Sequence, residues 1–150
     1  MQRFAIYLAL PLLLAAAPAG FTPGLWQITS APGTATLDGK PLGDLPYTPP
    51  TAPESVCVPA GDLRDPAAWL SRTVAEGCTL TRSSVARGRV DIAGTCPPQA
   101  PGLKPGAVRL TGRWTPGGYD LRFATTNPSE NGVMGFTGTL TGKRVGACRP

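Results

Sequence analysis

The stretch CTLTRSSVARGRVDIAGTC, residues 78–96, decides the fold because two runs with alternating apolar residues flank a turn. The runs predict two antiparallel strands. We predict a three-residue loop over residues 86–88, in which Gly88 accepts a positive φ without steric cost. Val85 then closes the loop opposite Arg89, and Cys78 lies directly opposite Cys96, close enough for a disulfide. A two-residue turn would shift this register by one residue and put the two thiols on opposite faces.

The chain contains four cysteines, and an even number in an oxidising compartment indicates disulfides. If Cys78 pairs with Cys96, elimination leaves Cys57 paired with Cys148. The alternative is a metal site with four cysteine ligands, which needs closely spaced pairs that this sequence lacks. The sequence therefore predicts two disulfides and no metal.

The first residues resemble an export signal. Arg3 precedes an apolar run over residues 4–16, and Ala17 and Ala19 supply the small residues of a cleavage site. We predict a signal peptide over residues 1–19, cleaved after Ala19; the alternative is an uncleaved anchor. This run is shorter than the roughly 20 apolar residues of a membrane helix, so we expect a periplasmic or secreted protein with no membrane span after cleavage.

The composition fits one small β domain over residues 20–150. Charged residues make up 15% of the chain, below the quarter usual in globular domains, and 14 basic against nine acidic residues give a net charge of +5. With 19 glycines and 18 prolines, turns must be frequent. Residues 31–54 are so rich in proline that we expect a mobile segment there and no central strand.

The remaining elements are one helix and three further strand regions. Asp65 followed by Pro66 predicts a helix start, with Trp69 sealing the core. We expect strands over residues 24–29 and 133–145, and a second hairpin in which Trp114 faces Tyr119. The fold class is therefore mainly β: a curved antiparallel sheet or open half-barrel of about six strands with one short helix, stapled by disulfides. Arg82 does not fit this pattern, because its parity points it inward.

Taken together, these motifs resemble the domain-of-unknown-function 3617 family of small exported bacterial proteins. The resemblance covers nearly all of residues 20–150 and implies a location in the Gram-negative envelope, without implying an activity. The proline-rich stretch differs from the methionine-rich segment of the family, so no role of that segment carries over. The motifs are Gly24-Leu25-Trp26, Val56-Cys57, Asp65-Pro66, the Cys78 to Cys96 hairpin and the ending from Gly138 to Cys148.

The residue inventory argues against an enzyme. The chain has no histidine, which rules out Ser-His-Asp and Cys-His catalysis and histidine metal sites. A hydrolase built on paired carboxylates is an alternative, but the nine acidic residues are scattered. No glycine-rich stretch fits a phosphate loop. We therefore expect no catalytic residues and no cofactor.

Two non-enzymatic functions remain. The first is an envelope interaction protein, in which Arg109, Arg113 and Arg122 share the outer parity of the second hairpin and contact an anionic surface, through phosphates of lipids or polyanions; the alternative is an ordinary solvated β face. The second is a binding module for an apolar or anionic ligand, with Trp26 and Trp114 lining its mouth; the alternative is that these aromatics form the core. Nucleic acid is not expected as a partner outside the cytoplasm.

Overall fold

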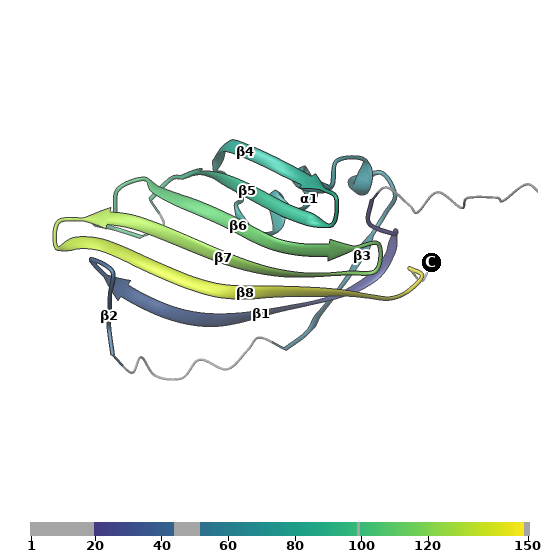
Figure 1. Cartoon of the computed structure of the whole chain (residues 1–150), viewed down its shortest axis with the longest axis horizontal. Coiled ribbons are helices and arrows are strands. Elements are labelled where there is room, and N and C mark those ends of the chain that lie inside the picture. The colour runs from purple at the N-terminus through teal and green to yellow at the C-terminus, as the bar shows by residue number, and fades with distance from the viewer. Residues whose placement is uncertain (1–19, 44–51, 99, 149–150) are drawn as a thin grey trace, which may run out of the picture.

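The computed structural model describes residues 20–43, 52–98 and 100–148, which form one antiparallel sheet with a short helix behind it (Figure 1). The strand order is β2-β1-β8-β7-β6-β5-β4, with β3 also paired to β1, and the sheet stays open between β2 and β4. The strands are β1 (Gly24–Leu37), β2 (Lys40–Pro41), β3 (Glu54–Val58), β4 (Thr79–Ala86), β5 (Arg89–Cys96), β6 (Gly106–Thr115), β7 (Gly118–Ser129) and β8 (Gly132–Gly146). The helices are the 3-10 turn η1 (Asp62–Arg64) and α1 (Pro66–Val74). The predicted fold class is confirmed, with eight strands in place of six.

The first hairpin has the predicted disulfide but a different turn. Ala86 pairs with Arg89, so the turn has two residues, and Arg87 and Gly88 both have positive φ. A bulge between Leu80 and Arg82 then inserts one residue into β4 and restores the register that brings Cys78 opposite Cys96. The predicted three-residue loop is therefore wrong, and the extra residue lies in the strand. The bulge also turns Arg82 to the face of the sheet that α1 does not cover. The inward position that simple alternation gave this residue is therefore not observed.

The second hairpin and the last strand follow the sequence prediction. Trp114 pairs with Tyr119, Leu110 with Phe123 and Arg113 with Asp120. Strand β8 pairs along almost its whole length with both β7 and β1. Strands β1, β8 and β7 are therefore the longest neighbouring strands of the sheet.

Strand β1 corrects the prediction for the proline-rich segment. Residues 31–37 belong to β1, and all but Gly33 and Thr34 pair with β8, so a strand forms where a loop was expected. Pro32 is tolerated because β3 pairs only with residues 24–28 and β2 only with 36–37, which leaves β1 paired on one side there. A bulge between Pro32 and Ala35 marks the same place. Residues 44–51 of the predicted mobile segment lie outside the described residues, as does the predicted signal peptide.

The two disulfides and the helix start are confirmed. Cys57 bonds to Cys148 and Cys78 bonds to Cys96. The first bridge passes across β1, because Leu25 pairs with Cys57 on one side and with Gly146 on the other. The side chain of Asp65 accepts a hydrogen bond from the Ala68 N–H at 2.9 Å and caps α1.

The core lies between α1 and the face of the sheet that α1 covers, which we call the inner face. Trp26, Trp69, Trp114 and Tyr119 gather there around Phe21, and the ring centroids in contact within this aromatic cluster are 5.0–6.0 Å apart. Trp26 is fully buried, and its indole N–H donates to the Thr22 carbonyl at 3.1 Å. Tyr119 lies over Gly142 and Phe123 over Gly138, where a Cβ would overlap each ring. The glycines therefore let aromatic rings lie flat against the sheet.

Candidate anion-binding face

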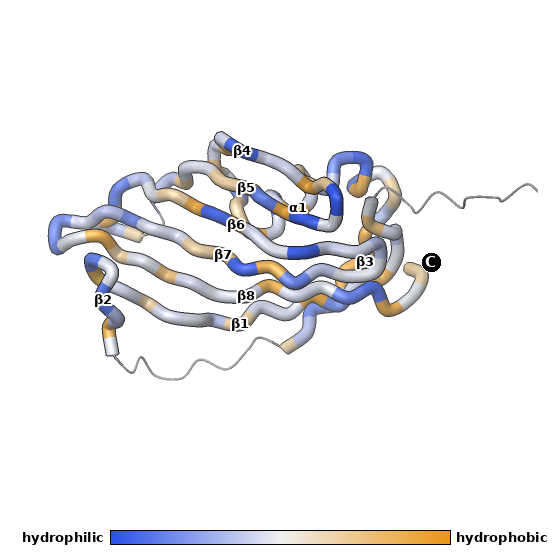
Figure 2. Tube along the Cα trace, viewed as in Figure 1, coloured by the Kyte–Doolittle hydropathy of each residue, from blue (hydrophilic) through white to orange (hydrophobic). Residues whose placement is uncertain are grey.

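The second face of the sheet carries the basic residues, and α1 lies behind it in the view of Figure 1. We call it the outer face. Threonine and charged side chains alternate along it, and the blue positions along β4 to β7 in Figure 2 include these charges. By strand alternation, its basic members are Arg82, Arg89, Arg109, Arg113, Arg122 and Lys143, all exposed, and its acidic members are Asp91 and Asp120.

The three arginines proposed from the sequence lie together around one residue. Thr111 pairs with Arg122 across β6 and β7, and Arg109 and Arg113 lie two residues before and after Thr111 on the same face. Neighbours at this diagonal spacing are within reach of long side chains. The register thus brings Arg109, Arg113 and Arg122 into one cluster.

Asp91 connects this cluster to β4. Its carboxylate accepts a hydrogen bond from the Arg82 guanidinium at 2.9 Å. Its second oxygen lies 3.6 Å from the Arg109 guanidinium, beyond hydrogen-bond distance. The hydrogen bond from Arg82 holds the pKa of Asp91 below its usual range, against a smaller opposing effect of desolvation. Asp91 is therefore bound chiefly to Arg82, and Arg109 keeps most of its donors free.

A hollow of about 420 Å³ lies beside the arginine cluster. Arg109 and Arg122 line it together with threonines from β6 and β8. The floor of the hollow lies at Ala124, which pairs with Arg109 on one side and Thr137 on the other and projects only a methyl group. The full lining is Gly33, Arg109, Thr111, Arg122, Phe123, Ala124, Thr137, Gly138 and Thr139.

Several donors in the hollow have no partner within the described part of the chain. Thr137 is engaged, since its hydroxyl accepts from the Thr34 N–H at 3.0 Å and donates to the Thr34 carbonyl. The hydroxyls of Thr111 and Thr139 and the guanidinium of Arg122 make no hydrogen bond or ion pair to any described residue. These three groups can therefore bind an external oxyanion without breaking an internal contact.

The predicted aromatic site residues lie elsewhere. Trp26 and Trp114 belong to the buried core cluster on the inner face, with 0% and 9% of their surface exposed. Neither lines the hollow of the outer face. Burial also raises the pKa of Tyr119, their neighbour in the cluster, so its phenol stays neutral.

The sequence reading missed part of the charged face. Arg89 lies directly opposite Arg113, and Arg82 reaches the face through the bulge. Alternation along the first hairpin could have identified Arg89 as outward. The free hydroxyls of Thr111 and Thr139 had no sequence signal, because outward threonines are common on any β-sheet.

The fold and the face define a class: a small disulfide-stapled protein with an open antiparallel sheet, in which a helix covers one face and none of the described residues covers the other, basic face. None of the described helices has the length and apolar character needed to cross a bilayer. In the described ranges, no three His, Cys, Asp or Glu residues are grouped as metal ligands would be. The family model of the protein of unknown function DUF3617 matches residues 21–148, and the chain belongs to that family. Comparison with curated proteins and with solved structures gives no significant match.

Proposed function

We propose that the protein is a non-enzymatic interaction protein of the cell envelope, and that its outer face binds an anionic lipid surface. The observation that carries this proposal is that, among the described residues, six exposed basic side chains and two carboxylates lie on the sheet face that α1 does not cover. The inner face, by comparison, is occupied by the core and α1.

The layout of the charges favours a planar partner. Neighbouring strands lie about 4.8 Å apart and successive residues about 3.4 Å, so the basic positions from β4 to β8 span roughly 19 Å by roughly 20 Å. A linear polyanion would be matched by a stripe of charge, whereas this patch extends equally in two directions. A bilayer surface with anionic headgroups has the same two-dimensional form.

The sequence and the disulfides together support the proposed location. Two disulfides suit an oxidising compartment, and the N-terminal residues fit a cleaved signal. We propose that the processed protein is periplasmic or secreted and meets anionic lipids there. A net excess of four positive charges at about 1 kcal/mol each gives weak, salt-sensitive attachment.

Vesicle binding tests the proposal. The exported, oxidised protein should bind vesicles containing phosphatidylglycerol and not vesicles of phosphatidylcholine alone. The double variant Arg113→Gln/Arg122→Gln removes about 2 kcal/mol of attraction and should weaken binding by about 30-fold at low salt.

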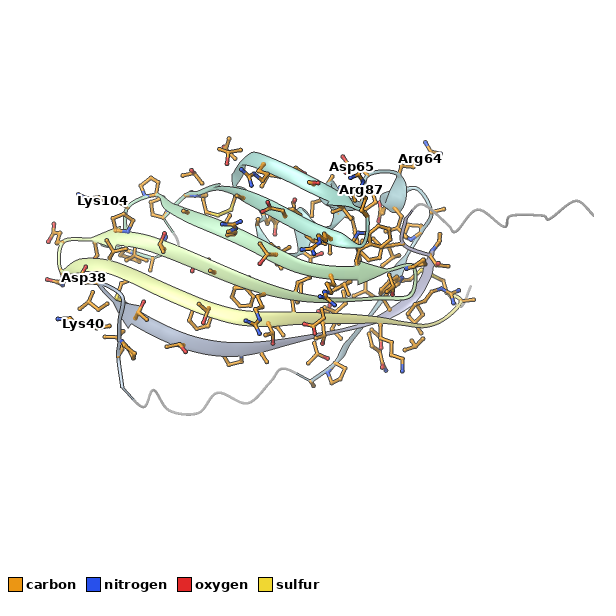
Figure 3. All side chains as sticks on the ribbon, viewed as in Figure 1. Asp38, Lys40, Arg64, Asp65, Arg87 and Lys104 are labelled. Atoms are coloured by element: carbon orange, nitrogen blue, oxygen red, sulfur yellow. A yellow bond between two sulfur atoms is a disulfide. The ribbon has the colours of Figure 1, made fainter. Side chains whose placement is uncertain are left out.

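The control removes two charges from other places. Arg64 in η1 and Lys104, which precedes β6, lie near opposite ends of the molecule (Figure 3), and neither belongs to the arginine cluster. Arg64→Gln/Lys104→Gln should change vesicle binding by less than about threefold, because distant exposed charges are screened. Equal losses in the two double variants would contradict binding through the outer face.

A second candidate function rests on the inner face. A hollow of about 390 Å³ lies where α1 ends, bounded by Ile28, Val74, Phe123 and Leu140 among other residues. This size and apolar lining would suit a small apolar ligand. Mass spectrometry of compounds that co-purify with the exported protein would identify such a ligand, and Leu140→Trp should then prevent its retention.

A further inference from the structure

The hollow of the outer face differs from the rest of that face. Elsewhere on this face, Arg113 faces Asp120 and Arg89 across the strands, and Arg82 is hydrogen-bonded to Asp91. At the hollow, Arg122 instead pairs with Thr111 on one side and Thr139 on the other, and all three polar groups are free within the described residues. A ring of free donors around a depression is the arrangement that binds one oxyanion.

We infer that this hollow is a subsite for a phosphate monoester headgroup at the lipid surface. The inference rests on the proposed function and names the headgroup that the outer face selects. Arg109 and Arg122 supply two guanidinium forks, which match the geometry and the near-double charge of a monoester. The hydroxyls of Thr111 and Thr139 supply two further donors.

The number of terminal oxygens distinguishes monoester from diester. A monoester presents three strong acceptor oxygens and has a single carbon substituent to direct out of the hollow. A diester has only two terminal oxygens and carries carbon on two sides, so it leaves one group of donors unsatisfied. The hollow has donors on β6, β7 and β8, which suits three acceptors.

Two carboxylates lie beside the subsite without lining it: Asp120, two residues before Arg122 on β7, and Asp91, which pairs with Thr111. The hydrogen bond of Asp91 goes to Arg82 on the far side, at 2.9 Å, while its contact with Arg109 is 3.6 Å. Arg109 can therefore turn toward a phosphate without losing a hydrogen bond. Its side chain is 62% exposed, which leaves room for that movement.

The test compares two vesicles of equal surface potential, one with phosphatidic acid, a monoester, and one with phosphatidylglycerol, a diester. The wild-type protein should prefer phosphatidic acid by about tenfold, the effect expected of added charged hydrogen bonds. Arg122→Gln should bring the preference close to one. Arg113→Gln removes the same charge from the same face outside the hollow, so it should weaken both vesicles while keeping the preference.

Two further measurements test the contribution of a threonine hydroxyl and distinguish a lipid headgroup from free phosphate. Thr139→Val removes one hydroxyl at nearly constant size and should reduce the preference several-fold without affecting folding. Glycerol 3-phosphate and inorganic phosphate are then added as soluble competitors, with amide NMR shifts recorded at Thr111, Arg122 and Thr139. Competition only at concentrations well above the lipid headgroup concentration supports a site that acts at the surface, whereas equally tight binding of free phosphate would overturn the lipid assignment.

The outcomes of the subsite and of the face are distinct. No preference in the wild-type protein, or equal loss of preference in Arg113→Gln and Arg122→Gln, overturns the subsite and leaves the basic face intact. No binding to either anionic vesicle overturns the proposed function and the subsite together.

Discussion

The inner and outer faces of this sheet are made by alternating residues of the same strands, yet they differ in almost every property. On β7, Tyr119 and Leu121 are buried in the core, while Asp120 and Arg122, which alternate with them, are exposed. The inner face pairs aromatic rings with glycines, and on the outer face Arg122 pairs with Thr111 and Thr139. The difference indicates that stability depends on one set of side chains and binding on the other.

The two faces are not independent at the N-terminal end of β1, because both depend on the Cys57–Cys148 disulfide. Cys57–Cys148 closes a separation of 91 residues and holds β3 and the end of β8 on either side of β1. Replacing both cysteines with serine should lower the free energy of unfolding by about 4–5 kcal/mol, against about 3 kcal/mol for the pair Cys78 and Cys96, whose separation is 18. Urea unfolding of the two double variants measures this order, and a larger loss for the hairpin bridge would contradict it.

Substitution of a core aromatic should separate the faces. Trp26→Ala leaves a cavity in the centre of the cluster and should cost about 3–5 kcal/mol of unfolding free energy. Under conditions where the variant remains folded, its affinity for anionic vesicles should equal that of the wild type. A selective loss of vesicle binding in the folded variant would show that the two faces are not independent.

Two glycines of β8 test the packing of the inner face within one strand. Gly142→Ala places a methyl group against the ring of Tyr119 and should destabilise by about 1–3 kcal/mol. Gly146→Ala, in the same strand, meets nothing within 4 Å and should change the unfolding free energy by less than about 0.5 kcal/mol. Equal thermal unfolding curves for the two variants would refute the account of ring-on-glycine packing.

The smallest expected effect concerns pH and the outer face. Because Arg82 holds the pKa of Asp91 below its usual range, their pairing stabilises the fold above the unfolded-state pKa near 4 and is lost as the pH falls through the folded-state value. Asp91→Asn should therefore lower the unfolding free energy slightly above about pH 4 and converge with the wild type at lower pH, which flattens part of the decline. Unfolding free energies measured across pH 2–7 in both proteins check this, and parallel curves would contradict it.

Much of the fold was accessible from the sequence, for identifiable reasons. The second hairpin alternates cleanly on both strands around a Pro-Gly turn, so pairing Trp114 with Tyr119 fixed its register. The first hairpin contains a bulge near Thr81, which has no sequence signature, and the one clue was the inward parity of Arg82. In β1, Pro32 argued against a strand, and only the tertiary structure shows that β1 has a single neighbour there.

The candidate site was only partly accessible. Parity placed Arg109, Arg113 and Arg122 on one face, and the register brings them together. The hollow depends on Ala124 lying between Arg109 and Thr137 across three strands, which a single sequence cannot show. The role suggested for Trp26 and Trp114 as ligand contacts does not follow from their position, since both are in the core.

The most direct measurement of the central claim is which face touches the membrane. Lipid nanodiscs containing phosphatidic acid and a spin-labelled headgroup broaden the amide NMR signals of residues close to the bilayer. We predict broadening at Thr111, Arg122 and Thr139 on the outer face, with sharp signals from Trp69 and Leu70 of α1. Broadening centred on α1, or spread evenly over both faces, would contradict the account.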